Sequence, residues 1–354
     1  MLNKEQQNEL RGNYLEAISS PVGENIQNLS MEAICNQFTK HPEWSIGPIT
    51  RDEEMTFVKK SVWNDPTGID WKCGFLFNPS LIAHDGKLFM FYRAAPKKES
   101  LCSRIGLAVY EEGKGWTDYD KNPVIYPTEP DELLGCEDPK IYKVGGKFIM
   151  FYHGVWRPER GEMERVSRET GFGIGFANNI KMAVSDDLFH WEKKGLVVPL
   201  SVSHLWAKAA VIPRNGNSEP VKINGEYVMY ISEGCGGKQH VGCSEDMYNW
   251  SFKEQRFLNI GDMGSLWEVS CAVTDEGEDD LLLDFYYCKP DKTNGGAQAL
   301  YSKKAPFDQR EINTGGTLSW GGLIKWKGKW MYAQGWDANN NGEQSMYFYT
   351  APVK

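Results

Sequence analysis

The chain repeats a short unit in which a polar turn precedes a run of alternating aliphatic and aromatic residues. Such runs, bounded by Gly, Asp or Asn, are typical of β-strands. A second apolar run follows each unit and a shorter one precedes it, which predicts several short strands per repeat. The five matched segments are DGKLFMFY (85–92), GGKFIMFY (145–152), NGEYVMYI (224–231), DDLLLDFY (279–286) and KGKWMYAQ (327–334).

Repeats of roughly 50 to 80 residues are the signature of propellers and repeat arrays. The strand-rich pattern excludes helical solenoids, and about four strands per repeat correspond to one propeller blade. The sequence therefore predicts an all-β fold, a five-bladed β-propeller that covers residues 41–354. A β-sandwich is the structural alternative, but it does not predict five matched turns.

Residues 1–40 lack this pattern and predict a short N-terminal helical extension. Its apolar residues Leu10, Tyr14, Leu15 and Ile18 recur at helical spacing among polar ones. These residues need a partner, either the outer strands of the propeller or a second copy of the chain in a homo-oligomer. A strand near 46–60 is expected to close the ring against the fifth blade.

Composition excludes several classes of function. The 354 residues carry a formal net charge of −9, so we expect no attraction to nucleic acid or to an anionic membrane surface. No apolar run is long enough for a transmembrane helix. The N-terminal segment has no signal-peptide pattern, which predicts a cytoplasmic protein; a periplasmic one would need a signal that is absent from this sequence.

Cysteine and histidine spacing gives no support for a metal or a cofactor. The eight cysteines form no CxxC pair, and the six histidines form no HExxH motif. We therefore expect reduced, mostly buried thiols, no metal and no cofactor.

Two strand starts carry polar residues at matching positions. Asn78-Pro79 and Asp138-Pro139 each lie seven residues before the turn of their blade. In a propeller these starts line the mouth of the central funnel, and the proline favours an extended conformation for the residue before it. An ordinary Asx turn is the alternative interpretation. Glu137 adjoins Asp138, and two neighbouring carboxylates raise a pKa, which suits acid catalysis.

Further charged residues fall at strand ends. Glu233 ends a strand of the third repeat, and Glu268 lies between apolar residues at a strand start of the fourth. Arg93 and Arg104 flank two strands of the first repeat. Such arginines either extend their head groups into solvent or hold hydroxyl groups and anions.

Two glycine-rich segments, GFGIGFAN (171–178) and GCGGKQ (234–239), superficially suggest phosphate loops. The first leads into a strand and the second lacks the Ser or Thr that follows Lys, so neither fits a nucleotide-binding motif. Most of the aromatic residues are expected to pack between blades, and a few near the funnel could stack on sugar rings.

The motifs FNPSLIAHDGKLFMFYRA, SRIGLAVYEEG, PVIYP, GCEDPKIY and SDDLFHW resemble glycoside hydrolase family 130, the mannoside phosphorylases and mannosidases. The resemblance covers about 75–352 and implies a five-bladed propeller that acts on β-mannosides with inversion. It implies that Asp138 is the general acid, which relays its proton through a mannose hydroxyl. It also places Asn78, Arg93, Arg104 and Glu137 on motifs that line the sugar site.

The sequence departs from the family's phosphorylases at the residues that hold phosphate. Lys208 keeps its place in KAAV, but Ile231-Ser232-Glu233 replaces a His-Arg pair and Asn179 replaces an Arg. These changes resemble the hydrolytic branch, which acts on β-1,2-mannosides and uses Glu side chains in place of the phosphate cluster. Because a carboxylate disfavours a phosphate dianion, Glu233 and Glu268 become candidates for activating water.

The sequence thus predicts an inverting β-mannosidase that acts on β-1,2-linked mannosides, with a β-mannoside oligosaccharide as its partner. One alternative is a phosphorylase that releases mannose 1-phosphate, with Lys208, Arg157 or other basic residues rebuilding the phosphate site. The other is a non-catalytic carbohydrate-binding propeller.

Overall fold

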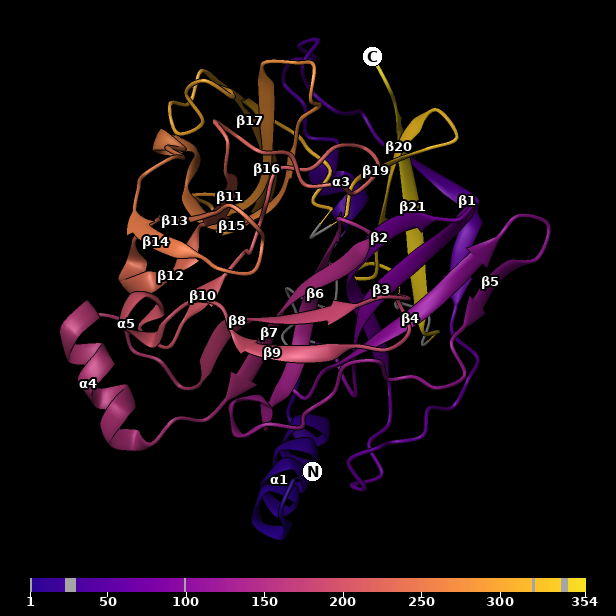
Figure 1. Ribbon diagram of the computed structural model, residues 1–354, viewed down its shortest axis with the longest axis vertical. Coiled ribbons are helices and arrows are strands. Elements are labelled where there is room, and N and C mark those ends of the chain that lie inside the picture. The colour runs from indigo at the N-terminus through magenta and orange to yellow at the C-terminus, as the bar shows by residue number, and fades with distance from the viewer. Residues whose placement is uncertain (1, 23–29, 99, 320–321, 339–342) are drawn as a thin grey trace.

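The computed structural model describes residues 2–22, 30–98, 100–319, 322–338 and 343–354, whose six antiparallel sheets form five blades arranged in a ring (Figure 1). Blade three is divided between two of these sheets. In blades one, two and four, strands that follow one another in the chain pair with each other. Blade one comprises β2 (Phe75–His84), β3 (Lys87–Ala95), β4 (Arg104–Glu111) and β5 (Gly115–Asp118). Blade two comprises β6 (Gly135–Val144), β7 (Lys147–Trp156), β8 (Ala177–Ser185) and β9 (Glu192–Leu196).

Blades three to five complete the ring. Blade three is formed by β10 (Ala207–Lys208), β11 (Tyr227–Ile231), β12 (Glu233–Gly234), β13 (His240–Ser244) and β14 (Ser251–Glu254). Blade four comprises β15 (Ser265–Val273), β16 (Asp280–Cys288), β17 (Asn294–Ser302) and β18 (Glu311–Thr314). Blade five comprises β19 (Ile324–Trp326), β20 (Lys329–Gln334), β21 (Ser345–Pro352) and β1 (Thr50–Val58).

Helices are few among the described residues, and the short helix that begins at Met31 is buried between blades four and five, whereas the others lie at the periphery of the ring (Figure 1). The helices are α1 (Lys4–Ser19), α3 (Met31–Cys35), α4 (Arg160–Thr170) and α5 (Leu200–Ser203), with short 3-10 turns η1 (Pro130–Glu132), η2 (Cys235–Gly237) and η3 (Gly261–Met263). No helix among the described residues is long and apolar enough to cross a membrane. The predicted five-bladed propeller with a short N-terminal helix is confirmed.

Each predicted turn-and-strand segment forms the second strand of a blade, namely β3, β7, β11, β16 and β20. The first strand of blade three is the exception to the repeat. The apolar run 209–215 forms no regular strand, and only the single bridge between Val211 and Tyr230 links it to β11. Ala209 has a left-handed φ of 65°, and Pro213 cannot donate a backbone hydrogen bond, so regular pairing is interrupted. In its place, the two-residue strands β10 and β12 set Lys208 opposite Glu233.

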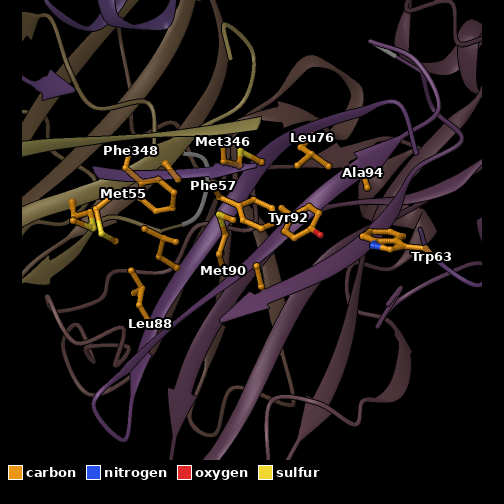
Figure 2. Close-up of a cluster of buried hydrophobic side chains, with 14 of the residues drawn as sticks. Met55, Phe57, Trp63, Leu76, Leu88, Met90, Tyr92, Ala94, Met346 and Phe348 are labelled. Atoms are coloured by element: carbon orange, nitrogen blue, oxygen red, sulfur yellow. The ribbon is translucent and has the colours of Figure 1, made fainter. Parts of the chain in front are cut away.

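The ring closes between the first strand and the last. β1 pairs antiparallel with β21, from Thr50 opposite Thr350 to Val58 opposite Ser345, as predicted for a strand near 46–60. Side chains of both strands pack with those of blade one in a single buried cluster (Figure 2). Phe57, Tyr92 and Phe348 lie in this cluster, so closure buries aromatic surface as well as pairing backbone groups.

Helix α1 begins with a capping box between Asn3 and Gln6 and lies at the edge of the ring (Figure 1). Leu10 joins the cluster of Figure 2, and Asn13 Nδ2 donates a hydrogen bond to the carbonyl oxygen of Leu133 at 2.8 Å. Leu15 is 55% exposed, so only part of the predicted apolar stripe packs on the propeller. The 1–40 and 41–354 division and the homo-oligomer remain predictions.

None of the eight cysteines forms a disulfide. Five are buried and three are partly buried, in agreement with the expected thiols.

Leu10→Ala should lower the free energy of unfolding by about 2 to 5 kcal/mol, because it removes a buried side chain and leaves a cavity. Leu15→Ala, on the exposed side of the same helix, is the matched control and should change it by no more than about 0.5 kcal/mol. Urea denaturation of both variants measures the difference. Equal effects would show that α1 does not depend on its contact with the propeller.

Candidate active site

A cavity of about 380 Å³ opens where side chains of all five blades converge. Blades one and two contribute Asn78, Arg93, Glu137 and Asn178; blades three to five contribute Trp206, Lys208, Glu233, Trp267, Glu268, Tyr286 and Trp336, among others. Six residues predicted from the sequence therefore line one cavity: Asn78, Arg93, Glu137, Lys208, Glu233 and Glu268. We call this space the active-site cavity.

Backbone bulges aim the two matched polar residues. Asn78 and Asp138 have left-handed φ values of 46° and 53°, and the register of β2 with β3 and of β6 with β7 shifts at these points. The extended conformation expected from the following prolines is therefore wrong. A bulge inserts an extra residue and redirects side chains, and Asn and Asp tolerate a left-handed backbone better than most residues. As a result, Asn78 Nδ2 donates to Asp138 Oδ1 at 2.6 Å.

Asp138 is buried among cationic partners. Its carboxylate oxygens lie 3.3 Å from Arg93 Nη1, 3.2 Å from Lys208 Nζ and 3.3 Å from His153 Nδ1. Burial raises the pKa of Asp138, but Lys208, Arg93 and His153 outweigh burial and hold this pKa well below its ordinary value. The predicted rise in pKa from the neighbouring Glu137 is therefore wrong for Asp138.

Glu137 shares the same two cations. Its carboxylate lies 2.8 Å from Arg93 Nη2 and 3.5 Å from Lys208 Nζ, and it accepts a hydrogen bond from Asn178 Nδ2 at 2.7 Å. Burial lowers the pKa of Lys208, but Asp138 and Glu137 more than offset this and hold the pKa well above its ordinary value. Lys208 is therefore a charged partner of two carboxylates.

Glu233 has the opposite electrostatic environment. Burial is the largest cause that raises its pKa, Glu268 and Asp138 add to the rise, and Lys208 opposes it; the resulting pKa is about 7. Trp206 Nε1 donates to Glu233 Oε1 at 3.1 Å. The raised carboxyl pKa that the sequence analysis expected in this region thus belongs to Glu233.

Glu268 lies on β15 and lines the same cavity, with Lys140 Nζ 3.6 Å from its carboxylate. Both candidate bases therefore lie in the cavity that Asp138 borders. Glu268 contributes to the raised pKa of Glu233, so the two carboxylates interact electrostatically.

Arg104 does not line the cavity, which corrects its predicted place in the sugar site. Its buried guanidinium lies 3.5 Å from Asp65, donates to Thr67 at 3.1 Å and stacks over Trp71 at 4.8 Å. Neighbouring residues of a strand point to opposite faces. It is the preceding residue, Ser103, whose hydroxyl accepts a hydrogen bond from Arg93 Nε at 2.7 Å.

The sequence analysis missed two polar residues of the site that the repeat itself identifies. His153 follows its turn by the same number of residues as Arg93, and both contact Asp138. Asn178 lies two residues before Ile180, the strand partner of His153, just as Ser103 lies two residues before Ile105, the strand partner of Arg93. The aromatic residues Trp206, Trp267 and Trp336 had no comparable signal, because most tryptophans of a propeller pack between blades.

Two other residues named in the sequence analysis lie apart from the cavity. Asn179 is buried and donates to the carbonyl oxygen of Val198 and to the hydroxyl of Ser203. Arg157 is partly exposed and pairs with Glu16 of α1 at 2.8 Å. Neither contributes a charge to the active-site cavity as the structure shows it.

Glu137, Asp138 and His153 place possible metal-ligand atoms within 4.8 Å of one another. Arg93 and Lys208 already contact both carboxylates, so a metal cation there would meet two positive charges. The side chains of Arg93 and Lys208 therefore neutralise these carboxylates in place of a metal ion. The expectation of no metal stays a prediction.

Fold and site together define a five-bladed β-propeller with a cavity that is lined by polar and aromatic side chains. A family model for glycoside hydrolase family 130, described as beta-1,4-mannooligosaccharide phosphorylase, matches residues 48–169. The resemblance to this family is thereby confirmed, through a match that covers blade one and much of blade two.

Two curated relatives come from Thermoanaerobacter sp. (strain X514). A 1,2-beta-oligomannan phosphorylase is 29% identical over 188 residues, 51% of this chain and 53% of the relative. A beta-1,2-mannobiose phosphorylase is 31% identical over 176 residues, 46% of this chain and 48% of the relative. The matches thus span about half the length of these relatives.

A solved structure from work on the GH130 family of mannoside phosphorylases and its hydrolases that target beta-1,2 mannosidic linkages in Candida mannan has the same fold. It superposes with a TM-score of 0.68 at 19% identity, over 90% of this chain and 98% of that chain. At this identity the likeness establishes the fold alone.

Glu268→Gln should lower the pKa of Glu233 from about 7, because it removes a carboxylate whose charge raises that pKa. The side-chain carboxyl signal of Glu233, followed by ¹³C NMR against pH, measures the change without any substrate. Glu226→Gln is the control, since Glu226 is exposed and precedes the first residue of β11, whereas Glu233 follows the last. An unchanged Glu233 pKa in Glu268→Gln would show that the two carboxylates do not interact.

Proposed function

We propose that this protein cleaves β-mannosides with inversion and that water is the nucleophile. The observation that carries the choice of water is the charge of the active-site cavity. Carboxylates of Glu137, Glu233 and Glu268 line it, and the buried Asp138 adjoins it.

The cations near these carboxylates are already engaged. Arg93 and Lys208 each contact both Glu137 and Asp138, and Lys140 contacts Glu268. Lys292 also lines the cavity and is exposed. A phosphate dianion would compete with buried carboxylates for Arg93, Lys208 and Lys140, whereas neutral water would not.

Glu233 is the stronger candidate for the general base. With a pKa of about 7 it is partly ionised at neutral pH and basic enough to accept a proton from water. Its hydrogen bond from Trp206 Nε1 fixes the orientation of one carboxylate oxygen. Glu268 is the second candidate and tunes Glu233 through its charge.

Asp138 remains the proposed acid, on the strength of the family motif. Its low pKa means that the carboxylate is ionised in the free protein, so it must gain a proton in the complex before it can donate one. Asn78 Nδ2 holds one carboxylate oxygen of Asp138, and Trp336 Nε1 in turn donates to Asn78 Oδ1 at 2.6 Å. These two hydrogen bonds fix Asp138 at the cavity wall, where a mannose hydroxyl could carry its proton to the leaving oxygen.

Phosphorolysis is the second candidate function, and the curated relatives support it better than they support hydrolysis. Both are phosphorylases that act on β-1,2-linked mannosides by name, and the family model also describes a phosphorylase. For this function, Lys208 and Lys292 would have to hold phosphate beside Glu233 and Glu268. The β-1,2 linkage is proposed for this chain from the same relatives.

Incubation with β-1,2-mannobiose should release mannose at the same rate with and without phosphate. ¹H NMR of the fresh product should show the α-anomer first, since an inverting enzyme converts the β-linkage into it. Product formed only when phosphate is present, as mannose 1-phosphate, would overturn hydrolysis and establish the phosphorylase. Failure to cleave any β-mannoside would favour a carbohydrate-binding propeller.

Asp138→Asn and Glu233→Gln should respond differently to the leaving group. Each should slow cleavage of mannobiose by about 10²- to 10⁴-fold, the usual contribution of general acid–base catalysis. An aryl β-mannoside with an acidic phenol needs little protonation, so Asp138→Asn should recover most of its activity on it, while Glu233→Gln should not. Steady-state rates on both substrates measure this contrast, and equal losses for both variants would contradict the assigned roles.

A further inference from the structure

The two glycine-rich segments that fit no nucleotide motif come together in space. Residues 172–176, which follow α4, line a second cavity of about 420 Å³ together with Gly234, Gly236 and Gly237 around η2. Phe176, Trp206 and Glu233 line both this space and the active-site cavity. The second cavity therefore adjoins the active-site cavity on the side of Glu233.

Aromatic rings form much of the wall of the second cavity. Phe176 and Trp206 lie with ring centroids 5.0 Å apart, and Phe172 is 55% exposed at the end of the loop. The ring of Phe172 lies directly against the backbone of Gly237, where an added Cβ would come within 2.4 Å of it. Gly237, with φ of 81°, thus allows the two loops to meet.

The rest of the wall combines glycines and the apolar side chains of Val166 and Ile174 with a few polar groups, and it carries little positive charge. Among the described residues that line the second cavity, the ionisable ones are His204 and Glu233, and neither Lys nor Arg occurs. This composition disfavours a phosphate or another anion. Aromatic rings with a few polar neighbours instead suit a sugar, whose ring has an apolar face and hydroxyls at its edge.

We propose that the second cavity binds a further mannosyl unit of an oligosaccharide substrate, beyond the two that flank the cleaved bond. This inference rests on the proposed function and deepens it, because it assigns the enzyme to chains longer than a disaccharide. The second cavity adjoins the active-site cavity at Trp206 and Glu233, which favours the substrate chain itself as the occupant. Phe172, which lines only the second cavity, is the platform against which the added sugar stacks.

The test compares kcat/KM for β-1,2-mannotriose with kcat/KM for β-1,2-mannobiose. The unmodified protein should prefer the trisaccharide, and Phe172→Ala should lower this preference by about tenfold, as expected for the loss of one stacking surface. Phe172→Trp should retain it. Tyr248→Ala is the matched control, since Tyr248 is an exposed aromatic residue that lines neither cavity.

A preference that is absent, or that Phe172→Ala leaves unchanged, would overturn this inference while mannobiose cleavage still supports the proposed function. Phe172→Ala could instead lower kcat/KM for an aryl β-mannoside and leave the trisaccharide preference unchanged. That result would also overturn the inference and assign the cavity to an apolar aglycone. If no β-mannoside is cleaved, the proposed function fails. Calorimetric titration with mannotriose then decides: binding that Phe172→Ala weakens supports the second cavity as a sugar site, and any other result overturns it.

Discussion

The active site is organised around one requirement: the buried carboxylates of Glu137 and Asp138 need cationic side chains in direct contact with them. An isolated buried charge is costly, and removing one member of a buried pair typically costs about 3 to 5 kcal/mol. Arg93 from blade one and Lys208 from blade three each contact both carboxylates of blade two. Charge pairing therefore ties three blades together at the mouth of the ring.

The same pairing separates the protonation states of two carboxyl groups in one cavity. Asp138 lies among three cationic or potentially cationic partners and keeps a low pKa. Glu233 has Lys208 opposite it on β10, but burial and Glu268 prevail and its pKa rises to about 7. One lysine thus contributes to both environments, because it contacts Asp138 directly and only moderates the charge of Glu233.

The repeat made the fold predictable from sequence. Five matched turns were enough to identify five blades, because each blade is a local antiparallel unit whose pattern does not depend on distant contacts. The same repeat located Asn78 and Asp138 at equivalent bulges, and it also contained the signal for His153 in the position of Arg93. Blade three broke the pattern, and the irregular pairing of β10 with β12 was not visible in the sequence.

What the sequence could not predict depends on side-chain direction and on long-range electrostatics. The family resemblance placed Arg104 in the sugar site, but alternation along the chain turns Ser103 toward Arg93 and Arg104 toward Asp65 and Trp71. The adjacent carboxylates of Glu137 and Asp138 suggested a raised pKa. Their cationic partners Arg93 and Lys208 lie far away in sequence, so no local pattern showed that they would lower it. The second cavity arises from two loops about sixty residues apart, a distance that no local motif reports.

If the proposed roles hold, the free protein rests in the protonation state that the reaction leaves behind. Inverting hydrolysis takes a proton from the acid and gives one to the base. Before substrate binds, Asp138 is already ionised and Glu233 already holds a share of a proton near neutral pH. A sugar that contacts Asp138 must therefore weaken its contacts with Lys208 and Arg93, which raises its pKa. A Lys208 released from Asp138 would act more strongly on Glu233 and lower the pKa of the base, so a single displaced cation would prepare both groups for the reaction.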